Sequence, residues 1–171
     1  DYLLLSEMLA FPSEKYIGEQ AQVIDIDGIH AVREFLLRSL AESLEKEWLQ
    51  VYIKHHTTLL NKKFAIEHVG MRQLKNRCLS FLMLLPQHFN LGVKQFEQSL
   101  AVNMTDTQAA LMALTNIDSP QREQALDKFY QHFINDPLVM DKWLSIQAIS
   151  NLPKTLSEVK ALYQHSAFDI K

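Results

Sequence analysis

Residues 27–52 read DGIHAVREFLLRSLAESLEKEWLQVY, and this stretch decides the fold class. Its apolar residues recur at intervals of three and four, which places them on one stripe of an α-helix. They are Ile29, Val32, Leu36, Leu40, Leu44, Trp48 and Val51. The pattern predicts a long helix from Asp27 to about Tyr52, and a break near Ser43 is compatible with it.

A second helix is predicted from Ile66 to Leu85. The expected buried side comprises Val69, Leu74, Cys78, Leu82 and Leu85. Pro86 should end this helix, because proline lacks the backbone N–H that the next turn needs.

Four helix starts can be recognised in the second half of the chain. Two of them, Ser119-Pro120 and Asp136-Pro137, pair a cap residue with proline at the first helical position, where the missing N–H costs nothing. Two fit capping boxes, Thr105 with Gln108 and Thr155 with Glu158. Alternate starts are 31 residues apart (105 to 136) and 36 apart (119 to 155), which is near the period of helical repeats.

The predicted fold is all-α, a right-handed α-solenoid-like stack of short antiparallel helices. A helical bundle is the alternative architecture, since short loops favour antiparallel neighbours in both. Only four glycines are present, which leaves little material for hairpin turns, and no stretch alternates between apolar and polar residues as a half-buried strand does. Because nothing reads as a linker, residues 1–171 are predicted to form a single helical domain.

Composition argues against several classes of partner. The formal net charge is −3, and Lys and Arg are scattered among acidic residues, so no basic patch for nucleic acid is expected. The longest apolar run, residues 81–85, is far shorter than the about 20 residues of a membrane span. Cys78 is the only cysteine, so a reducing compartment, the cytoplasm, is the simpler expectation.

The search for chemistry finds no catalytic, cofactor-binding or metal-binding residue. His55 and His56 are adjacent and would point about 100° apart on a helix, so they cannot hold one ion together. His68 follows Glu67 but no second histidine lies four residues away, so the zinc motif H-E-x-x-H is absent. Cys78 is interpreted as a small buried hydrophobe. Trp143, at helical spacing from Val139 and Met140, is interpreted as core.

Several short segments, in order and at compatible spacing, resemble the bacterial aminopeptidase N family. They are VRE and LR in residues 32–41, RQLKN and CL in residues 70–79, NMTD and AAL in residues 103–111, LVMDKW and QA in residues 138–148, and VKAL, QH and AF in residues 159–168. Each is short, and the series together makes the resemblance specific.

The resemblance implies a zinc metallo-aminopeptidase, a bacterial hydrolase of the membrane alanyl aminopeptidase type that removes N-terminal residues from peptides. In that family the C-terminal helical domain caps the catalytic domain and encloses the substrate chamber. Residues 1–171 would be part of this cap, without zinc of their own, and the rest of the parent chain and its peptide substrates would be their partners. The family's chamber-facing arginines follow an Asn-Pro-Asn-Arg motif, which the resemblance places after Lys171.

The alternative function is a free-standing helical-repeat module that binds a partner protein. One further expectation concerns the C-terminal end, where Leu156, Val159, Leu162 and Tyr163 of the final helix, and then Phe168 and Ile170, have no following repeat in this sequence to cover them. Weak self-association through that end is therefore predicted.

Overall fold

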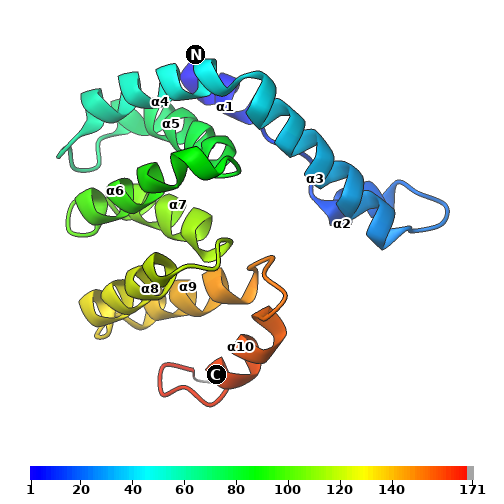
Figure 1. The fold of residues 1–171 in the computed structure, drawn as a ribbon. Coiled ribbons are helices and arrows are strands. Elements are labelled where there is room, and N and C mark those ends of the chain that lie inside the picture. Colours follow the sequence, from blue (N-terminus) through cyan, green and yellow to red (C-terminus); the bar gives the residue numbers. More distant parts are fainter. Residues whose placement is uncertain (169–171) are drawn as a thin grey trace. The chain divides into compact units, whose positions relative to one another are not determined.

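The computed structural model describes residues 1–168, and residues 169–171 lie outside this description. Over the described residues the chain is 73% helical and contains no strand, which confirms the all-α prediction. The chain forms two compact units, residues 1–89 and residues 90–171, whose helices are labelled in Figure 1. The prediction of a single domain over the whole chain stays a prediction.

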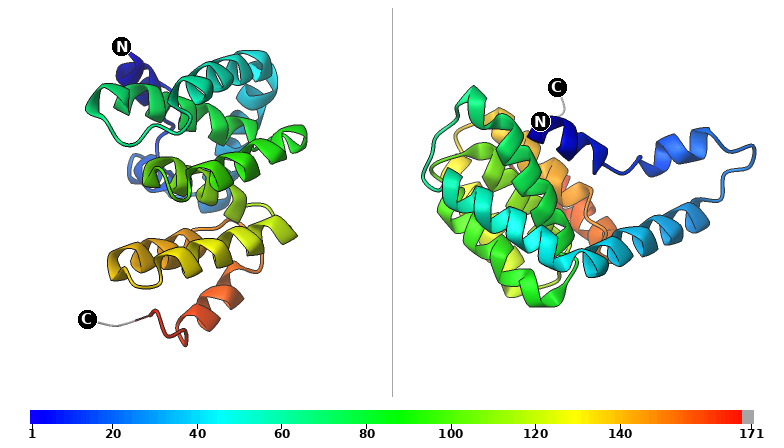
Figure 2. Two further views of the ribbon diagram at one scale, coloured as in Figure 1. Left: turned by 90° about the vertical axis from the view of Figure 1, so that its left-hand side faces the viewer. Right: turned by 90° about the horizontal axis from the view of Figure 1, so that it is seen from above.

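The first unit contains five α-helices and two short 3-10 helices. They are α1 (Tyr2–Met8), α2 (Glu14–Glu19), α3 (Ile26–Ser43), α4 (Glu45–Leu59), η1 (Ile66–His68), α5 (Val69–Leu82) and η2 (Pro86–His88). Helices α4 and α5 lie side by side, and α1 packs on α5. Helix α2 and the first half of α3 extend away from α4 and α5 as a hairpin (Figures 1 and 2).

The long helix predicted from the opening stretch is two helices. Helix α3 ends at Ser43 and α4 begins at Glu45, so the break lies at the predicted place. The start was predicted one residue late. Asp25 is the N-cap, and its side chain accepts a hydrogen bond from the Gly28 N–H at 2.9 Å, so the helix begins at Ile26.

Helix α5 is shorter than predicted at both ends. Residues 66–68 form the 3-10 turn η1, and the α-helix ends at Leu82. Leu85 has extended backbone angles (φ −107°, ψ 117°), because the residue before a proline avoids the helical region. Leu74, Cys78, Leu82 and Leu85 are nevertheless all buried, as the spacing predicted, whereas Val69 is only half-buried.

The core of the first unit centres on an aromatic pair between α4 and α5. The rings of Trp48 and Phe81 stack with centroids 4.5 Å apart and an interplanar angle of 5°. The Trp48 indole N–H donates to the carbonyl of Leu40 at 3.0 Å, so its one polar group is satisfied in the core.

The second unit contains the remaining helices. They are α6 (Phe89–Ser99, whose first residue falls in the first unit), α7 (Met104–Thr115), α8 (Pro120–Phe133), α9 (Pro137–Ala148) and α10 (Thr155–Leu162). Helix α7 packs on α8 and α9, α8 packs on α9, and α9 packs on α10. Trp143 of α9 is 7% exposed and its indole N–H donates to the carbonyl of Leu126 in α8 at 3.0 Å, which confirms its place in the core.

The two Pro-containing helix starts are confirmed. The Ser119 hydroxyl accepts from the Arg122 N–H at 3.2 Å, and the Asp136 carboxylate accepts from the Val139 N–H at 3.3 Å. Helix α8 therefore begins at Pro120 and α9 at Pro137.

Both predicted capping boxes are wrong. Helix α7 is capped by Asn103, whose side-chain oxygen accepts from the Asp106 N–H at 3.2 Å, and Thr105 lies inside the helix. Asparagine is at least as good a cap as threonine and lies two residues earlier. Helix α10 has no side-chain cap bond: its N-cap residue is Lys154, Thr155 is its first helical residue, and Glu158 contacts Arg122.

At the C-terminal end, Leu156, Tyr163 and Phe168 are exposed, as expected, whereas Val159 and Leu162 are half-buried, and Ile170 lies outside the described residues. The predicted self-association through this end stays a prediction. Among residues 1–168, no helix combines the length and the hydropathy that a membrane crossing requires.

Candidate functional site

The adjacent histidines His55 and His56 contact different aromatic rings. The His55 ring lies edge-on to Tyr2 with centroids 4.7 Å apart, whereas the His56 ring stacks on Tyr52 at 5.2 Å. Within residues 1–168 no group of three or more His, Cys, Asp or Glu side chains could hold a metal ion. Among the described residues, His55 and His56 therefore contact different rings and join no set of three metal-binding side chains.

Two other histidines pair with single carboxylates. His88 Nε2 lies 2.7 Å from Glu45 Oε1, and the Gln87 amide donates to the same oxygen at 3.1 Å. The hydrogen bonds from Gln87 and His88 hold the pKa of the Glu45 carboxyl below its usual value. His30 Nδ1 lies 2.9 Å from Glu14 Oε1, and this hydrogen bond raises the pKa of His30.

Cys78 is placed for packing. Its side chain is 1% exposed on the apolar face of α5. Burial raises the pKa of the Cys78 thiol to about 12, so the thiol stays protonated at neutral pH and is a poor nucleophile.

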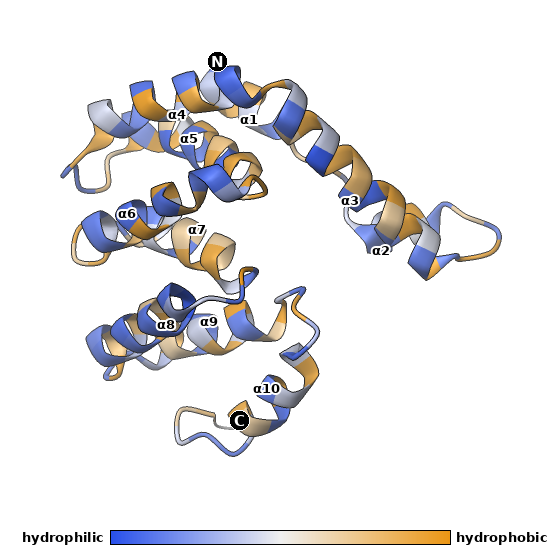
Figure 3. Cartoon of the chain, in the orientation of Figure 1, coloured by the Kyte–Doolittle hydropathy of each residue, from blue (hydrophilic) through white to orange (hydrophobic). Residues whose placement is uncertain are grey.

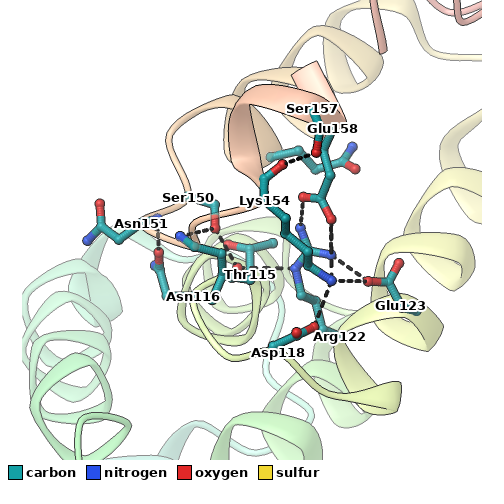
Figure 4. A network of polar contacts seen from close by, with 12 residues as sticks. Thr115, Asn116, Asp118, Arg122, Glu123, Ser150, Asn151, Lys154, Ser157 and Glu158 are labelled. Atoms are coloured by element: carbon teal, nitrogen blue, oxygen red, sulfur yellow. Dashed lines mark hydrogen bonds and ion pairs between the residues drawn. The ribbon is translucent and has the colours of Figure 1, made fainter. Parts of the chain in front are cut away.

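A network of polar contacts surrounds Arg122 in the second unit (Figure 4). The Arg122 side chain is 1% exposed. Its Nη2 donates to Glu158 Oε2 at 2.5 Å, and its Nη1 donates to Glu158 Oε1 at 3.2 Å and to Glu123 Oε1 at 2.5 Å. Its Nε donates to the carbonyl of Thr115 at 3.2 Å. We call this group, with Lys154 and Asp118, the Arg122 cluster.

Lys154 forms the solvent side of the Arg122 cluster. Its ammonium lies 2.6 Å from Asp118, 3.4 Å from Glu158 and 3.6 Å from Glu123. The hydrogen bond from Lys154 lowers the pKa of Asp118, and the same bond raises the pKa of Lys154. Two cations thus face three carboxylates, and each cation contacts more than one of them.

The Arg122 cluster fastens the last helix to the preceding ones. Helix α10 contributes Glu158, α8 contributes Arg122, and α7 contributes the Thr115 carbonyl. That carbonyl also accepts from the Ser150 hydroxyl at 2.8 Å, so one oxygen receives two donors. Because the donors of Arg122 are directed at protein acceptors, the arrangement is that of a structural clamp. The sequence analysis missed it, although the 36 residues between Arg122 and Glu158 equal one interval between alternate helix starts.

A second feature is an apolar surface on α3 in the first unit. Val32, Phe35 and Leu36 are 59%, 68% and 42% exposed, and only Ala41 is buried among the 18 residues of the helix. A stable 18-residue helix that leaves its largest apolar side chains bare is typical of an interaction surface.

Packed helix pairs of this kind occur in helical bundles and in helical-repeat proteins alike. All of residues 1–171 match the family described as "Domain of unknown function (DUF3458_C) ARM repeats", and the chain belongs to this family. ARM repeats are solenoid-like helical stacks, which agrees with the predicted fold class.

The chain is similar to proteins named aminopeptidase N. It is 36% identical to that of Escherichia coli over 172 residues, 34% to that of Haemophilus influenzae over 169 and 30% to that of Caulobacter vibrioides over 164. The matches cover 98%, 99% and 95% of this chain, and 19% of each relative. The chain therefore spans about a fifth of the length of these relatives, and the family resemblance found in the sequence is confirmed.

A solved structure gives the same result. The aminopeptidase A of Legionella pneumophila, crystallised in complex with aspartic acid, superposes with a TM-score of 0.86 at 28% sequence identity. The similarity covers 98% of this chain and 21% of that one. The chain thus corresponds to a helical part of an aminopeptidase.

Proposed function

We propose that residues 1–171 are part of the non-catalytic C-terminal helical domain of a bacterial zinc-dependent aminopeptidase. One observation carries the proposal: three proteins named aminopeptidase N align with 95–99% of this chain while the chain covers 19% of each. The parent protein would hydrolyse N-terminal residues from peptides, with the zinc and its ligands in another domain. The cytoplasm is the proposed location.

In this proposal the helical domain forms part of the wall of the substrate chamber and takes no part in catalysis. Helix pairs held by buried contacts such as Trp143–Leu126 and Arg122–Glu158 make a stiff wall. A wall around the substrate chamber admits short flexible peptides and keeps folded proteins out. It also excludes bulk water, which strengthens electrostatic interactions near a metal ion.

The experiment is a peptidase assay on the full-length parent protein. We expect it to release the N-terminal residue of a short alanyl peptide and of an aminoacyl reporter, and to lose this activity when a chelator removes the metal. The same N-terminal residue on a tightly folded protein should be released at least tenfold more slowly. A full-length protein without peptidase activity would contradict the proposal and favour the free-standing interaction module.

A further inference from the structure

Helix α10 and the turn that follows it contain no buried residue. This holds for every residue from Asn151 to Phe168, whereas α7, α8 and α9 bury six, four and five residues. Figure 3 shows hydrophilic and hydrophobic residues mixed over α10. A helix of eight residues is too short to be stable alone, and one that buries no side chain completely gains little from the hydrophobic effect. The position of α10 therefore depends on a few specific attachments.

The first attachment lies at the beginning of α10. Glu158 accepts from both Nη groups of Arg122, whose side chain is buried in α8. Lys154, the N-cap residue of α10, contacts Asp118 at 2.6 Å. Figure 4 shows these contacts between α10 and the preceding helices. The attachment is polar, and Arg122 provides its buried side.

The second attachment lies just beyond the end of α10 and is aromatic. The His165 ring lies 5.2 Å from the ring of Tyr130 in α8 and 5.2 Å from that of Trp143 in α9, and these two rings are 5.1 Å apart. The Ala167 N–H donates to His165 Nδ1 at 3.1 Å, which fixes the imidazole within its own turn. Aromatic rings at these separations stabilise one another beyond the area that they bury.

The two attachments enclose a segment that buries nothing between them. Segments with few buried contacts open locally at a lower free energy than the core to which they are attached. We propose that residues 155–168 form a strap against α8 and α9 that opens as one unit while α7, α8 and α9 stay folded. Glu158 and His165 are its two fasteners. The inference does not depend on the proposed function, because both fasteners and their partners lie within this chain.

Opening of the strap has a defined structural consequence. It removes His165 from the rings of Tyr130 and Trp143 and removes Glu158 from the guanidinium of Arg122. Two aromatic rings and a cation of the second unit then become accessible to water, although the strap covers them in the closed state. The strap is therefore a conformational device, and its closed state is set by two residues.

The test is hydrogen exchange of the full-length protein, followed by mass spectrometry of its peptides. Glu158→Gln removes the charge of the first fastener. Glu123→Gln is the matched control, because Glu123 also accepts from Arg122 Nη1 but lies on α8. His165→Ala removes the second fastener and serves alone if Glu158→Gln does not fold, and His165→Phe keeps an aromatic ring at that position.

In the unmodified protein, peptides from residues 155–168 should exchange at least about tenfold faster than peptides from α9. Glu158→Gln and His165→Ala should each accelerate exchange of residues 155–168 by about fivefold or more, while exchange of α9 changes by less than about twofold. Glu123→Gln should leave the strap nearly unchanged, and His165→Phe should restore most of the protection that His165→Ala removes.

Four results would overturn the inference. Residues 155–168 that exchange as slowly as α9 in the unmodified protein would show that the strap does not open separately. Acceleration of α9 together with the strap would show that α10 unfolds only with the rest of the unit. An effect of Glu123→Gln as large as that of Glu158→Gln, or equal exchange in His165→Phe and His165→Ala, would show that the named fastener does not hold the strap.

Discussion

The guanidinium of Arg122 in α8 and the carboxylate of Glu158 in α10 form a two-pronged ion pair across 36 positions of sequence. Nη2 lies 2.5 Å from Oε2 and Nη1 lies 3.2 Å from Oε1. The Arg122 side chain is 1% exposed and that of Glu158 is 24% exposed. A planar guanidinium matches both oxygens of a carboxylate, and lysine could not reproduce this geometry.

Removing Arg122 should therefore destabilise the chain strongly. Arg122→Met keeps most of the side-chain volume but leaves Glu158 with Lys154, 3.4 Å away, as its remaining cation, and the Thr115 carbonyl without one of its two donors. Loss of one partner of a buried ion pair costs about 3–5 kcal/mol. Urea unfolding should show a loss near the lower end of this range, because Glu158 can be partly rehydrated.

Lys154, the other cation of the Arg122 cluster, provides the matched control. Lys154→Ala removes contacts to Asp118 and Glu123, which are 69% and 60% exposed, and a 3.4 Å contact to Glu158, and Lys154 is itself 37% exposed. Exposed ion pairs contribute about 0–1 kcal/mol. If Arg122→Met lowers the unfolding free energy by no more than Lys154→Ala does, the description of Arg122 as a buried clamp is contradicted.

The positions of most helices could be predicted from the sequence, but the contact between Arg122 and Glu158 could not. The reason is that helix signals are local, whereas this contact joins two helices. Apolar spacing and local caps act within a few residues, so the break near Ser43 and the starts at Pro120 and Pro137 could be predicted. Glu158 was assigned to a capping box because that motif is local, and its actual partner lies on another helix. Tertiary contacts between charged residues leave no local pattern to recognise.

The replacement Trp143→Ala tests the core of the second unit. The indole is 7% exposed and donates to the Leu126 carbonyl, and its ring lies 5.1 Å from that of Tyr130. The expected loss is about 3–5 kcal/mol of unfolding free energy, as for other buried large-to-small changes. Trp143→Phe should lose less, because it keeps an aromatic ring and gives up mainly the hydrogen bond. A loss below about 1 kcal/mol for the alanine variant would mean that the side chain is not core.

Stability should also depend on pH through His55. Burial lowers the pKa of His55 in the folded chain below the value of about 6.5 of an unfolded histidine. Between these two values the unfolded chain binds a proton that the folded chain does not, so stability falls as the pH drops below about 6.5. The unfolding free energy of the unmodified chain should fall more between pH 7.5 and pH 5.5 than that of His55→Gln. If the unfolding free energies of the unmodified chain and of His55→Gln fall equally, His55 is not responsible for the pH dependence.

The C-terminal end gives a prediction about association. Leu156, Tyr163 and Phe168 are 67%, 56% and 38% exposed. The 171-residue chain should associate weakly at high concentration, and Leu156→Glu with Tyr163→Glu should reduce this association by placing charge on the surface. Sedimentation over a concentration series is the measurement. A strictly monomeric unmodified chain would mean that these side chains do not form a contact surface.

We propose that these helices shape an aminopeptidase whose chemistry lies elsewhere in the polypeptide. Metal analysis of the purified, tag-free 171-residue chain beside the full-length parent protein tests it most directly. We expect one tightly bound zinc per full-length chain and none in the 171-residue chain, which should also leave an aminoacyl reporter uncleaved. One tightly bound zinc in the 171-residue chain, or a full-length protein that binds none, would contradict it.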